Sequence, residues 1–551
     1  MSYVERGEQY ARDVLAGEIP ACELVRLSCQ RYFDDLERQW EYEFDEDRAE
    51  RACKFYELFP HTKGKWARAS NNLMRLEAWQ IFIEMNLMGW VHKDTEYRRF
   101  RRSYEEVPRK NGKSDRVARR GLYTLAADHE FGAEVYSGAT TEKQAWEVFR
   151  PARLMAMRTP GFLEHYGVEV NAKSVNLPED GSRFEPIIGN PGDGASPSHA
   201  IVDEYHEHKT AALYDTMETG MGAREQPLLS AITTAGDNLG GPCYGLRDYA
   251  VKVLQGVVED DGLFAMIYTI DDDTDWTSDL ALRMANPNYG VSVQPDYLKS
   301  QQQTAINDSR KQGTFKTKHL NVWVGARDAF FNLEAWRACS NEGLRLEDFT
   351  GQRCVMALDL ASKVDIAALE LMFPLEGGSY ARFGKYYLPR STVSRTEHEH
   401  YKAWETDGWL TVTEGNITDY DKIKEDILGW CSEFQVEAVG YDPHQATYLV
   451  SELGKEGVPC VEYRPTVLNF SEPMKQLDAL MLDNRITHQP DPVMDWQVSN
   501  VVAKLDAKDN VYPRKEREEN KIDNVVASIM CMGLLMTPEE TETAVPRVRM
   551  L

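Results

Sequence analysis

The spacing of apolar residues changes several times along the chain. In the first sixty residues, apolar side chains recur at helical spacing, as in ACELVRLSCQRYFDDLERQWEYEF, and this spacing predicts helices. From Trp90 to Thr234, short apolar runs alternate with helical stretches, which is typical of a parallel sheet with crossover helices. A fresh strand begins at CVMALDLA and opens a second alternation. The pattern therefore predicts two α/β domains.

Chain length and a change of pattern set the expected domain boundaries. At 551 residues the chain exceeds one hydrophobic core, since single cores stop growing near roughly 250–300 residues. Between Phe315 and Gln352 an aromatic-rich passage gives way to a helical one. We predict a helical N-terminal appendage at residues 1–60, a first α/β domain at 61–340, a linker at 341–350, a second α/β domain at 351–538 and a flexible tail at 539–551.

Composition excludes several classes of protein. No apolar run approaches the roughly 18 residues that span a bilayer, and the start MSYVERGEQY carries charges where a signal peptide is apolar. We therefore expect no membrane partner and a cytoplasmic location. Nine cysteines without a CxxC pair signal neither a zinc ribbon nor a disulfide framework. A net charge of −26 argues against coating nucleic acid with the whole surface, so any DNA contact must be local.

One stretch of the chain is strongly basic. Its interpretation stays open between a solvated face around a phosphate site and a local DNA contact. The residues are Arg98, Arg99, Arg101, Arg102, Arg109, Lys110, Lys113, Arg116, Arg119 and Arg120.

The segment EVPRKNGKS ends in the Gly-Lys-Ser of a phosphate-binding loop. Gly112 lets the backbone approach phosphates, Lys113 reaches the β- and γ-phosphates, and the Ser114 hydroxyl ligates Mg²⁺. The match is incomplete, because the full pattern requires glycine where this chain has Val107. Taken alone, a Gly-Lys-Ser tripeptide at the start of a helix is common, so the motif needs support from elsewhere in the chain.

Two further strands supply that support. The run AIVDE ends in Asp203 and Glu204, and buried strand-end carboxylates need a cation or hydrogen bonds. Asp203 is suited to hold Mg²⁺, and Glu204 to orient and deprotonate the attacking water. The segment ITTAG places Thr233 and Thr234 after another apolar strand, where they are candidates to sense the γ-phosphate. A plain strand followed by a turn explains ITTAG equally well.

Acidic residues also follow apolar strands in the second domain. Asp359 follows VMAL, Asp442 follows VEAVGY, and Asp523 opens a predicted helix. Carboxylates that converge from two strand ends and a helix can bind two divalent ions, one activating water and the other stabilising a phosphodiester leaving oxygen. Asp365 or Asp478 is a candidate further ligand. Each aspartate, considered singly, is also explained as a helix cap or a turn residue.

The order of these pieces resembles the large terminase subunit of tailed bacteriophages, especially the group that cuts at cohesive ends. The resemblance rests on VPRKNGKS, IVDEYHEH, ITTAG and FKTKHLNVW, followed by Asp359, Asp442 and Asp523, and it covers roughly residues 70 to 535. It is specific in order and spacing more than in any one motif. Loops in this family commonly depart from the standard pattern, which makes Val107 less exceptional.

The resemblance implies a fold and a set of ligands. The first domain would be a P-loop ATPase of the additional-strand, catalytic-glutamate (ASCE) type that binds ATP and Mg²⁺. Gln80, in LEAWQ, would contact the adenine base, and Arg109 and Asn111 would join the loop residues around the nucleotide. The second domain would be a ribonuclease-H-like nuclease in which Asp359, Asp442 and Asp523 hold two Mg²⁺ or Mn²⁺ ions.

The resemblance also implies partners and a place of action. Family members translocate double-stranded DNA into a procapsid and cut concatemers to genome units. They form a homo-oligomeric ring, taken here as a pentamer, on the portal protein, and a small terminase subunit recognises the DNA ends. A neighbour's arginine completes each ATP site; Arg183 and Arg224 are candidates here. We expect the protein in the bacterial cytoplasm, transiently at the portal vertex and not in the mature virion.

Three alternatives remain open at this point. An ATP-dependent repair nuclease or helicase would need a second RecA-like lobe with its own arginines, whereas the C-terminal third offers strand-end acids. A binding module with a degenerate ATPase would lack ATP turnover. His206 and His208 also suggest a zinc site, although their spacing is not H-E-x-x-H and no third ligand cluster is evident.

Overall fold

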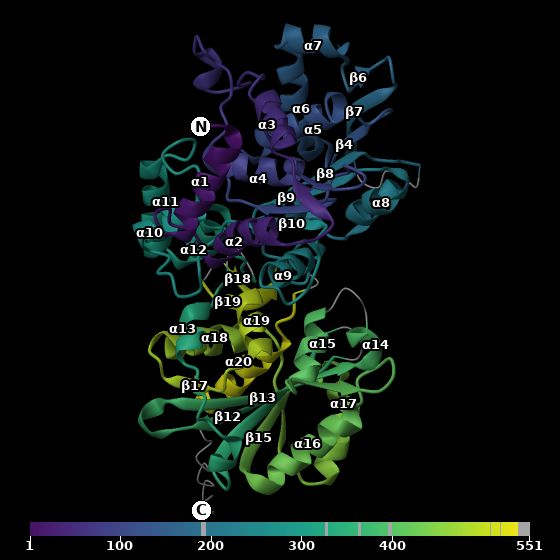
Figure 1. The fold of residues 1–551 in the computed structure, drawn as a ribbon. Coiled ribbons are helices and arrows are strands. Elements are labelled where there is room, and N and C mark those ends of the chain that lie inside the picture. Colours follow the sequence, from purple (N-terminus) through teal and green to yellow (C-terminus); the bar gives the residue numbers. More distant parts are fainter. Residues whose placement is uncertain are drawn as a thin grey trace, which may run out of the picture. The chain divides into compact units, whose positions relative to one another are not determined.

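The computed structural model describes residues 1–188, 194–325, 329–361, 365–394, 399–506, 509–517 and 520–537 (Figure 1). The chain divides into two compact units, Met1–Val324 and Gly325–Leu551. This division lies upstream of the linker predicted at 341–350, because helix α13 (Leu333–Ala338) already belongs to the second unit. There the Trp336 ring stacks on His488 with the ring centroids 3.7 Å apart. The tail predicted at 539–551 lies outside the described residues.

The first unit contains an eight-stranded sheet with the order β10-β3-β9-β8-β4-β7-β6-β5. Neighbouring strands from β10 to β7 run parallel, and β6 and β5 are antiparallel additions. Strands β8 and β9 are buried at every residue, as expected for parallel strands covered on both faces. The strands are β3 (Arg102–Glu106), β4 (Glu134–Ala139), β5 (Glu169–Val170), β6 (Val175–Leu177), β7 (Ser182–Ile188), β8 (His199–Asp203), β9 (Leu228–Thr233) and β10 (Leu263–Ile267), with a separate antiparallel pair β1 (Tyr42–Phe44) and β2 (Trp90–His92).

Helices cover both faces of this sheet. Ile201 of β8 packs in one core cluster with side chains of α1 to α7, whereas Ala200 and Val202 pack in another with α8 and α9. Successive strand residues point to opposite faces, so one strand serves both clusters. The helices are α1 (Tyr3–Leu15), α2 (Glu23–Glu37), α3 (Glu46–Tyr56), α4 (Ala78–Gly89), α5 (Lys113–Ala126), α6 (Glu142–Met157), α7 (Pro160–Tyr166), α8 (Ala212–Gly220), α9 (Pro242–Leu254), α10 (Asp279–Ala285), α11 (Pro295–Asn307) and α12 (Ser309–Phe315).

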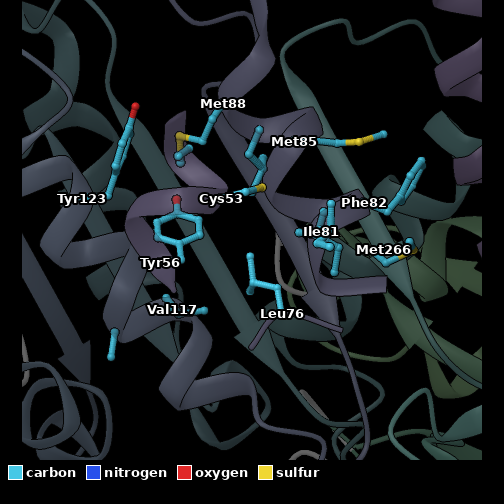
Figure 2. Close-up of a cluster of buried hydrophobic side chains, with 14 of the residues drawn as sticks. Cys53, Tyr56, Leu76, Ile81, Phe82, Met85, Met88, Val117, Tyr123 and Met266 are labelled. Atoms are coloured by element: carbon cyan, nitrogen blue, oxygen red, sulfur yellow. The ribbon is translucent and has the colours of Figure 1, made fainter. Parts of the chain in front are cut away.

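The N-terminal helices are part of the main core of this unit. Figure 2 shows buried side chains of α3, α4, α5 and β10 in one cluster, among them Tyr56, Val117 and Met266. The hydroxyl oxygens of Tyr10 and Tyr268 lie 2.8 Å apart. Residues 1–60, which the sequence suggested as an appendage, therefore complete the hydrophobic core beside the sheet.

The basic stretch between residues 98 and 120 lies mostly inside the protein. Arg116 and Arg120 are fully buried and bind Glu84 and Glu105, with 2.6 Å between Arg116 and Glu84 and 2.6 Å between Arg120 and Glu105. Arg99 lies over several aromatic rings, which stabilises its charge. A solvated face is therefore the wrong interpretation, since buried charges need partners and these have them. Of the ten residues, the exposed ones are Arg101, Arg109 and Lys110.

The second unit contains a mixed sheet with the order β14-β13-β12-β11-β15-β16, and β17 pairs with β13. Strands β13, β12 and β11 are antiparallel neighbours, and β15 and β16 continue parallel to β11. This run of three antiparallel strands followed by two parallel ones is the order of a ribonuclease-H-like sheet. The strands are β11 (Arg353–Asp359), β12 (Ala367–Pro374), β13 (Tyr380–Pro389), β14 (Leu410–Thr413), β15 (Gln435–Tyr441), β16 (Cys460–Glu462) and β17 (Ile486–His488), with a hairpin of β18 (Val501–Leu505) and β19 (Val511–Lys515).

Helices again pack on the sheet. Cys354, Met356 and Leu358 of β11 share a core cluster with α16 and α17, while α20 packs on β11 and β12. Gly440 of β15 allows α20 to approach, because a β-carbon built there would lie 2.9 Å from Leu534 Cδ1. The helices besides α13 are α14 (Arg390–Val393), α15 (Glu399–Thr406), α16 (Tyr420–Glu433), α17 (Pro443–Lys455), α18 (Val467–Leu482), α19 (Pro492–Asn500) and α20 (Asp523–Met536). Within the described ranges, no helix is both long and apolar enough to cross a membrane.

Candidate active sites

The segment between β3 and α5 has the geometry of a phosphate-binding loop. Lys110 and Gly112 both adopt left-handed backbone conformations, with φ of 71° and 81°, and Arg109 is exposed. Val107, which stands where the standard pattern has glycine, is fully buried in the core and donates its N–H to the Thr233 carbonyl oxygen at 3.1 Å. The core accommodates its side chain, so the missing glycine leaves the loop intact.

Lys113 and Ser114 begin α5 at the end of this loop. The buried Lys113 ammonium donates to the carbonyl oxygen of Val107 and, at 3.4 Å, to that of Pro108. Burial lowers the pKa of Lys113 to about 8, although the nearby charges of Glu204 and Asp203 oppose this shift. The first N–H groups of a helix have no helical partner and face its positive end, so this position favours a phosphate group.

Two asparagines that the sequence did not reveal hold the loop. Asn111 Nδ2 donates to Asn286 Oδ1 at 3.0 Å, and Asn111 Oδ1 accepts the Asn288 N–H at 2.9 Å. The segment ANPNYG that carries them marks a turn, but a single sequence does not link that turn to a distant loop. Gln80 lies next to the same loop, because a β-carbon built on Gly112 would be 3.6 Å from Gln80 Nε2.

Asp203 is the last residue of the central strand β8, and Glu204 follows it. Strand β9 lies between β8 and β3, so the acids and the loop occupy the same edge of the sheet. Asp203 is buried and accepts the Glu204 N–H at 2.9 Å. Burial, followed by the charge of Glu204, raises the pKa of Asp203 to about 8. Burial alone would also raise the pKa of Glu204, but the charge of Lys113 above all reverses the shift and lowers it.

The opposed pKa shifts distinguish the two carboxyl groups chemically. Asp203 is a group whose ionised form needs a cation nearby, since uncompensated burial disfavours the charge. Glu204 stays ionised and adopts a left-handed conformation with φ of 47°, which turns it away from the strand direction. A carboxylate that holds a cation beside one that accepts a proton is the combination that nucleotide hydrolysis requires.

Thr233 ends β9, the strand between β3 and β8, and Thr234 follows it. Thr233 Oγ1 donates to the Thr234 carbonyl oxygen at 2.8 Å and accepts the His206 N–H at 3.0 Å. Thr234 Oγ1 is buried and makes no hydrogen bond within the described part of the chain. Since an unpaired buried hydroxyl costs about 1–3 kcal/mol, Thr234 is the better candidate to meet a ligand oxygen.

His206 and His208 are bonded to protein groups. His206 Nδ1 lies 3.0 Å from Thr233 Oγ1, and His208 Nε2 lies 3.2 Å from the Asp203 carbonyl oxygen. Burial lowers the pKa of both rings, that of His208 to about 4. Across the residues that the structure describes, no three histidine, cysteine, aspartate or glutamate side chains are arranged to hold a metal ion. The zinc alternative therefore has no set of ligands.

The two candidate arginines differ in their surroundings. Arg224 donates to the carbonyl oxygens of Ser196 at 2.8 Å and Gly132 at 3.0 Å, and its side chain is 15% exposed. Arg183 lies in strand β7, donates to the Tyr136 hydroxyl at 2.9 Å and is 44% exposed. Arg183 is therefore the more exposed of the two, although it also pairs with Glu134 and Glu185, each at 3.3 Å.

Three aspartates of the second unit come from two strands and a helix. β11 pairs with β15 as far as Leu358 and Tyr441, so Asp359 and Asp442, the next residues, lie side by side at one edge of the sheet. Asp523 opens α20, which packs on β11. Burial, and then the charges of Asp523 and Asp442, raise the pKa of Asp359 well above its usual value. Burial above all raises the pKa of Asp523 to about 6.

These acids interact electrostatically, but they do not form a ready set of ligands for one ion within the described residues. Mutual repulsion keeps carboxylates apart, and a cation would draw them together. Asp523 Oδ2 is buried without a hydrogen-bond partner in the described residues, and oxygen donors suit Mg²⁺ and Mn²⁺. Asp365 belongs to the group, although Lys515 and Lys521 bind it and lower its pKa against the effect of burial. Asp478 lies in α18, and burial alone raises its pKa to about 6.

A buried polar network fixes the start of α20. Asn524 Nδ2 donates to Glu370 Oε1 at 2.9 Å, the Asn524 N–H donates to Gln497 Oε1 at 2.8 Å, and Ser528 Oγ donates to Glu370 Oε2 at 3.2 Å. Arg382 pairs with Glu370 from the other side. Asn524 follows Asp523 directly, so this network sets where that carboxylate lies. In the sequence, this network is indicated only by Glu370, a single acid within the apolar strand AALELMF.

A nucleotide-hydrolysing unit followed by a ribonuclease-H-like unit defines a DNA-processing ATPase and nuclease. Two family models match the chain: "Terminase large subunit, ATPase domain" over residues 78–252 and "Terminase large subunit, endonuclease domain" over residues 257–539. The chain belongs to the terminase large subunit family. It is therefore an ATPase and an endonuclease of viral DNA packaging and cutting, and these matches give no support to the repair alternative.

The chain is also similar to individual proteins and to a solved structure. Protein YmfN of Escherichia coli (strain K12) is 44% identical over 365 residues, which cover 64% of this chain and 80% of that protein. The terminase large subunit of Enterobacteria phage HK97 is 25% identical over 438 residues, covering 78% of this chain and 85% of that protein. The crystal structure of the HK97 bacteriophage large terminase aligns with a TM-score of 0.45 at 24% identity, covering 88% of this chain and 99% of that one.

Proposed function

We propose that the first unit hydrolyses ATP to move double-stranded DNA into a procapsid. Lys113 and the N–H groups of the loop bind the phosphates, and Ser114 and Asp203 hold Mg²⁺. Glu204 accepts the proton of the attacking water. The placement of Asp203, Glu204 and Lys113 at one edge of the parallel sheet carries this proposal. Asn111, Gly112 and Arg109 surround the phosphates, Thr234 and Thr233 sense the γ-phosphate, and Gln80 contacts the base.

Glu204→Gln tests the assignment of the base. The amide keeps the size of the side chain but cannot accept the proton, so ATP turnover and packaging should fall about 10²- to 10⁴-fold. Binding of a fluorescent ATP analogue should stay within about twofold, because Lys113 and the loop are untouched. Asp215→Asn, which alters an exposed carboxylate on α8, is the matched control and should retain most of its turnover. Packaging by Glu204→Gln at the wild-type rate would show that another group is the base.

We further propose that Asp359, Asp442 and Asp523 bind two Mg²⁺ or Mn²⁺ ions that activate water and stabilise the leaving oxygen of a DNA phosphodiester. The convergence of two strand ends with the start of α20, and the unpaired Asp523 Oδ2, support this set. Asp442→Ala should abolish metal-dependent cleavage of plasmid DNA and leave ATP turnover unchanged. Asp478→Ala, on α18, is the control. If Asp442→Ala still cleaves while Asp478→Ala does not, the ligand set is wrong.

The partners proposed for this protein follow from its family. They are the portal protein of the procapsid, a small terminase subunit that selects DNA ends, and other copies of this chain in a pentameric ring. Arg183 rather than Arg224 is the proposed arginine that reaches a neighbouring ATP site, since Arg224 is held by two carbonyl oxygens. The protein would act in the host cytoplasm and at the portal vertex, and would be absent from the mature virion. ATPase assays that mix Arg183→Ala and Glu204→Gln subunits would test this arrangement.

A further inference from the structure

The segment FKTKHLNVW, which the roles above leave unused, crosses the ATP site. We call residues 316–324 the strap. It begins as a π-helix, Lys316–Leu320, a form that is rare and frequent at functional sites. Asn321 then turns with a φ of 60°, and its Oδ1 accepts the Ala235 N–H at 2.7 Å. The Trp323 indole N–H donates to Glu106 Oε2 at 3.0 Å. The strap is thus bonded to the ends of both β3 and β9.

Lys318 is the strap residue that contacts His206, whose ring lies beside Glu204. Its side chain is buried, its Nζ lies 3.2 Å from His206 Nε2, and its carbonyl oxygen accepts the Arg109 N–H at 3.1 Å. On the other side of the imidazole ring, His206 Nδ1 lies 3.2 Å from Glu204 Oε2 and 3.0 Å from Thr233 Oγ1. The imidazole ring therefore stands between the lysine and the carboxylate.

The hydrogen-bond partners of His206 determine which of its ring nitrogens carries the proton. An ammonium group only donates, so the contact from Lys318 uses the lone pair of His206 Nε2 and leaves the ring proton on Nδ1. That proton bonds Thr233 Oγ1, and Glu204 Oε2 lies 3.2 Å from the same nitrogen without a hydrogen bond of its own in the described residues. A proton on Nε2 would instead face Glu207 Oε1, 3.2 Å away, and would turn the Nδ1 lone pair toward the negative Glu204 carboxylate, which repels it. Lys318, together with Thr233, whose hydroxyl donates to the Thr234 carbonyl oxygen, favours the first arrangement.

We propose that Lys318 is a positioning residue for ATP hydrolysis that acts through the His206 ring on the Glu204 carboxylate. The inference rests on the role proposed above for Glu204. This role would connect the strap to hydrolysis. A displacement of the π-helix would move Lys318 away from His206, and the ring would then be less firmly held beside Glu204. Because the same segment carries the carbonyl bonded to Arg109, the position of the phosphate loop and the orientation of the base change together.

Lys318→Met in the full chain tests this role, because methionine keeps the length and apolar stem of the side chain and removes the donor. We expect kcat for ATP to fall about tenfold to a hundredfold, as loss of orientation does, while KM and the Kd of a fluorescent ATP analogue stay within about twofold. Lys318→Arg should recover part of kcat. Lys311→Met, at an exposed position of α12, is the matched control and should behave as wild type.

A double-variant cycle separates positioning from a structural role. His206→Asn retains an N–H near the Nδ1 position but has no atom at Nε2, so adding Lys318→Met to it should reduce kcat no further. An unchanged kcat in Lys318→Met, a parallel loss of nucleotide affinity and melting temperature, or additive effects in the double variant would each overturn the inference. Glu204→Gln is measured alongside. If it loses turnover while Lys318→Met does not, the inference alone is wrong; if it retains turnover, the proposed base is wrong as well.

Discussion

Asp523→Asn is expected to stabilise the second unit while it abolishes cleavage. Burial, and then the charge of Asp365, raise the pKa of Asp523 from 3.8 to about 6, so the folded protein disfavours the carboxylate at neutral pH. That difference corresponds to roughly 3 kcal/mol, since one pKa unit equals about 1.4 kcal/mol. Partial exposure and salt screening reduce it to about 1–2 kcal/mol. Asparagine has the same shape without the charge and should regain this amount.

The sign of the pH dependence follows from the direction of the shift. The folded-state pKa lies above the unfolded-state value, so the penalty is absent below pH about 4, grows as the pH rises, and is complete above pH about 6. Calorimetry of the full chain in EDTA at pH 8 should give Asp523→Asn a Tm about 2–8 °C above that of wild type for the second unit. At pH 5 the gap should shrink to about half.

Metal addition provides the second arm of this experiment. Mg²⁺ should raise the Tm of the wild-type second unit, because the ion binds the folded acids, and should raise that of Asp523→Asn much less. Asp478→Asn is a useful comparison, since burial raises its pKa to about 6 as well, whereas the carboxylates that act on Asp359 are those of Asp523, Asp442 and Asp365. Equal Tm values for wild type and Asp523→Asn at pH 8, or an equal response of both to Mg²⁺, would refute the reasoning.

Three further predictions concern residues that support the two sites. Glu84→Gln should lower the free energy of unfolding of the first unit by about 3–5 kcal/mol in urea denaturation, because Arg116 and Arg120 lose a buried carboxylate; no loss would contradict the ion network. Asn288→Ala should weaken binding of a fluorescent ATP analogue about tenfold by freeing the loop, and unchanged affinity would show that the loop holds itself. Asn524→Ala should reduce metal-dependent cleavage about 10- to 100-fold at constant ATP turnover, and full cleavage would exclude a positioning role.

The candidate sites were predicted from local sequence signals, because short apolar strands that end in acids indicate both a sheet and the edge at which the acids gather. Asp203 ends the fully buried strand β8 and Glu204 follows it. Asp359 ends β11, and Asp442 follows β15, which pairs in parallel with β11. The carboxyl ends of parallel strands lie at the same edge of a sheet, so acids that end neighbouring parallel strands lie close together. The two-domain α/β organisation was predictable for the same reason.

Long-range packing explains what the sequence did not reveal. Arg116 and Arg120 looked like surface charges because their partner Glu84 lies in another helix, and a single sequence does not pair them. Asn288 reads as an ordinary turn residue until the fold brings it to the phosphate loop. The boundary between the units was placed too far along the chain because α13, centred on Trp336, packs with residues far downstream.

The position of β10 and the strap has a practical consequence for isolating the ATPase. The matched ATPase region ends at residue 252, within α9, yet β10 lies beside β3, and Trp323 contacts Glu106. A recombinant fragment that ended at residue 252 would lack β10 and leave β3 as an unpaired edge strand, which favours aggregation. It would also lack Trp323, whose indole N–H donates to Glu106. A fragment of residues 1–324 would keep both β10 and the strap beside β3, so we expect it to suit the isolation of the ATPase better.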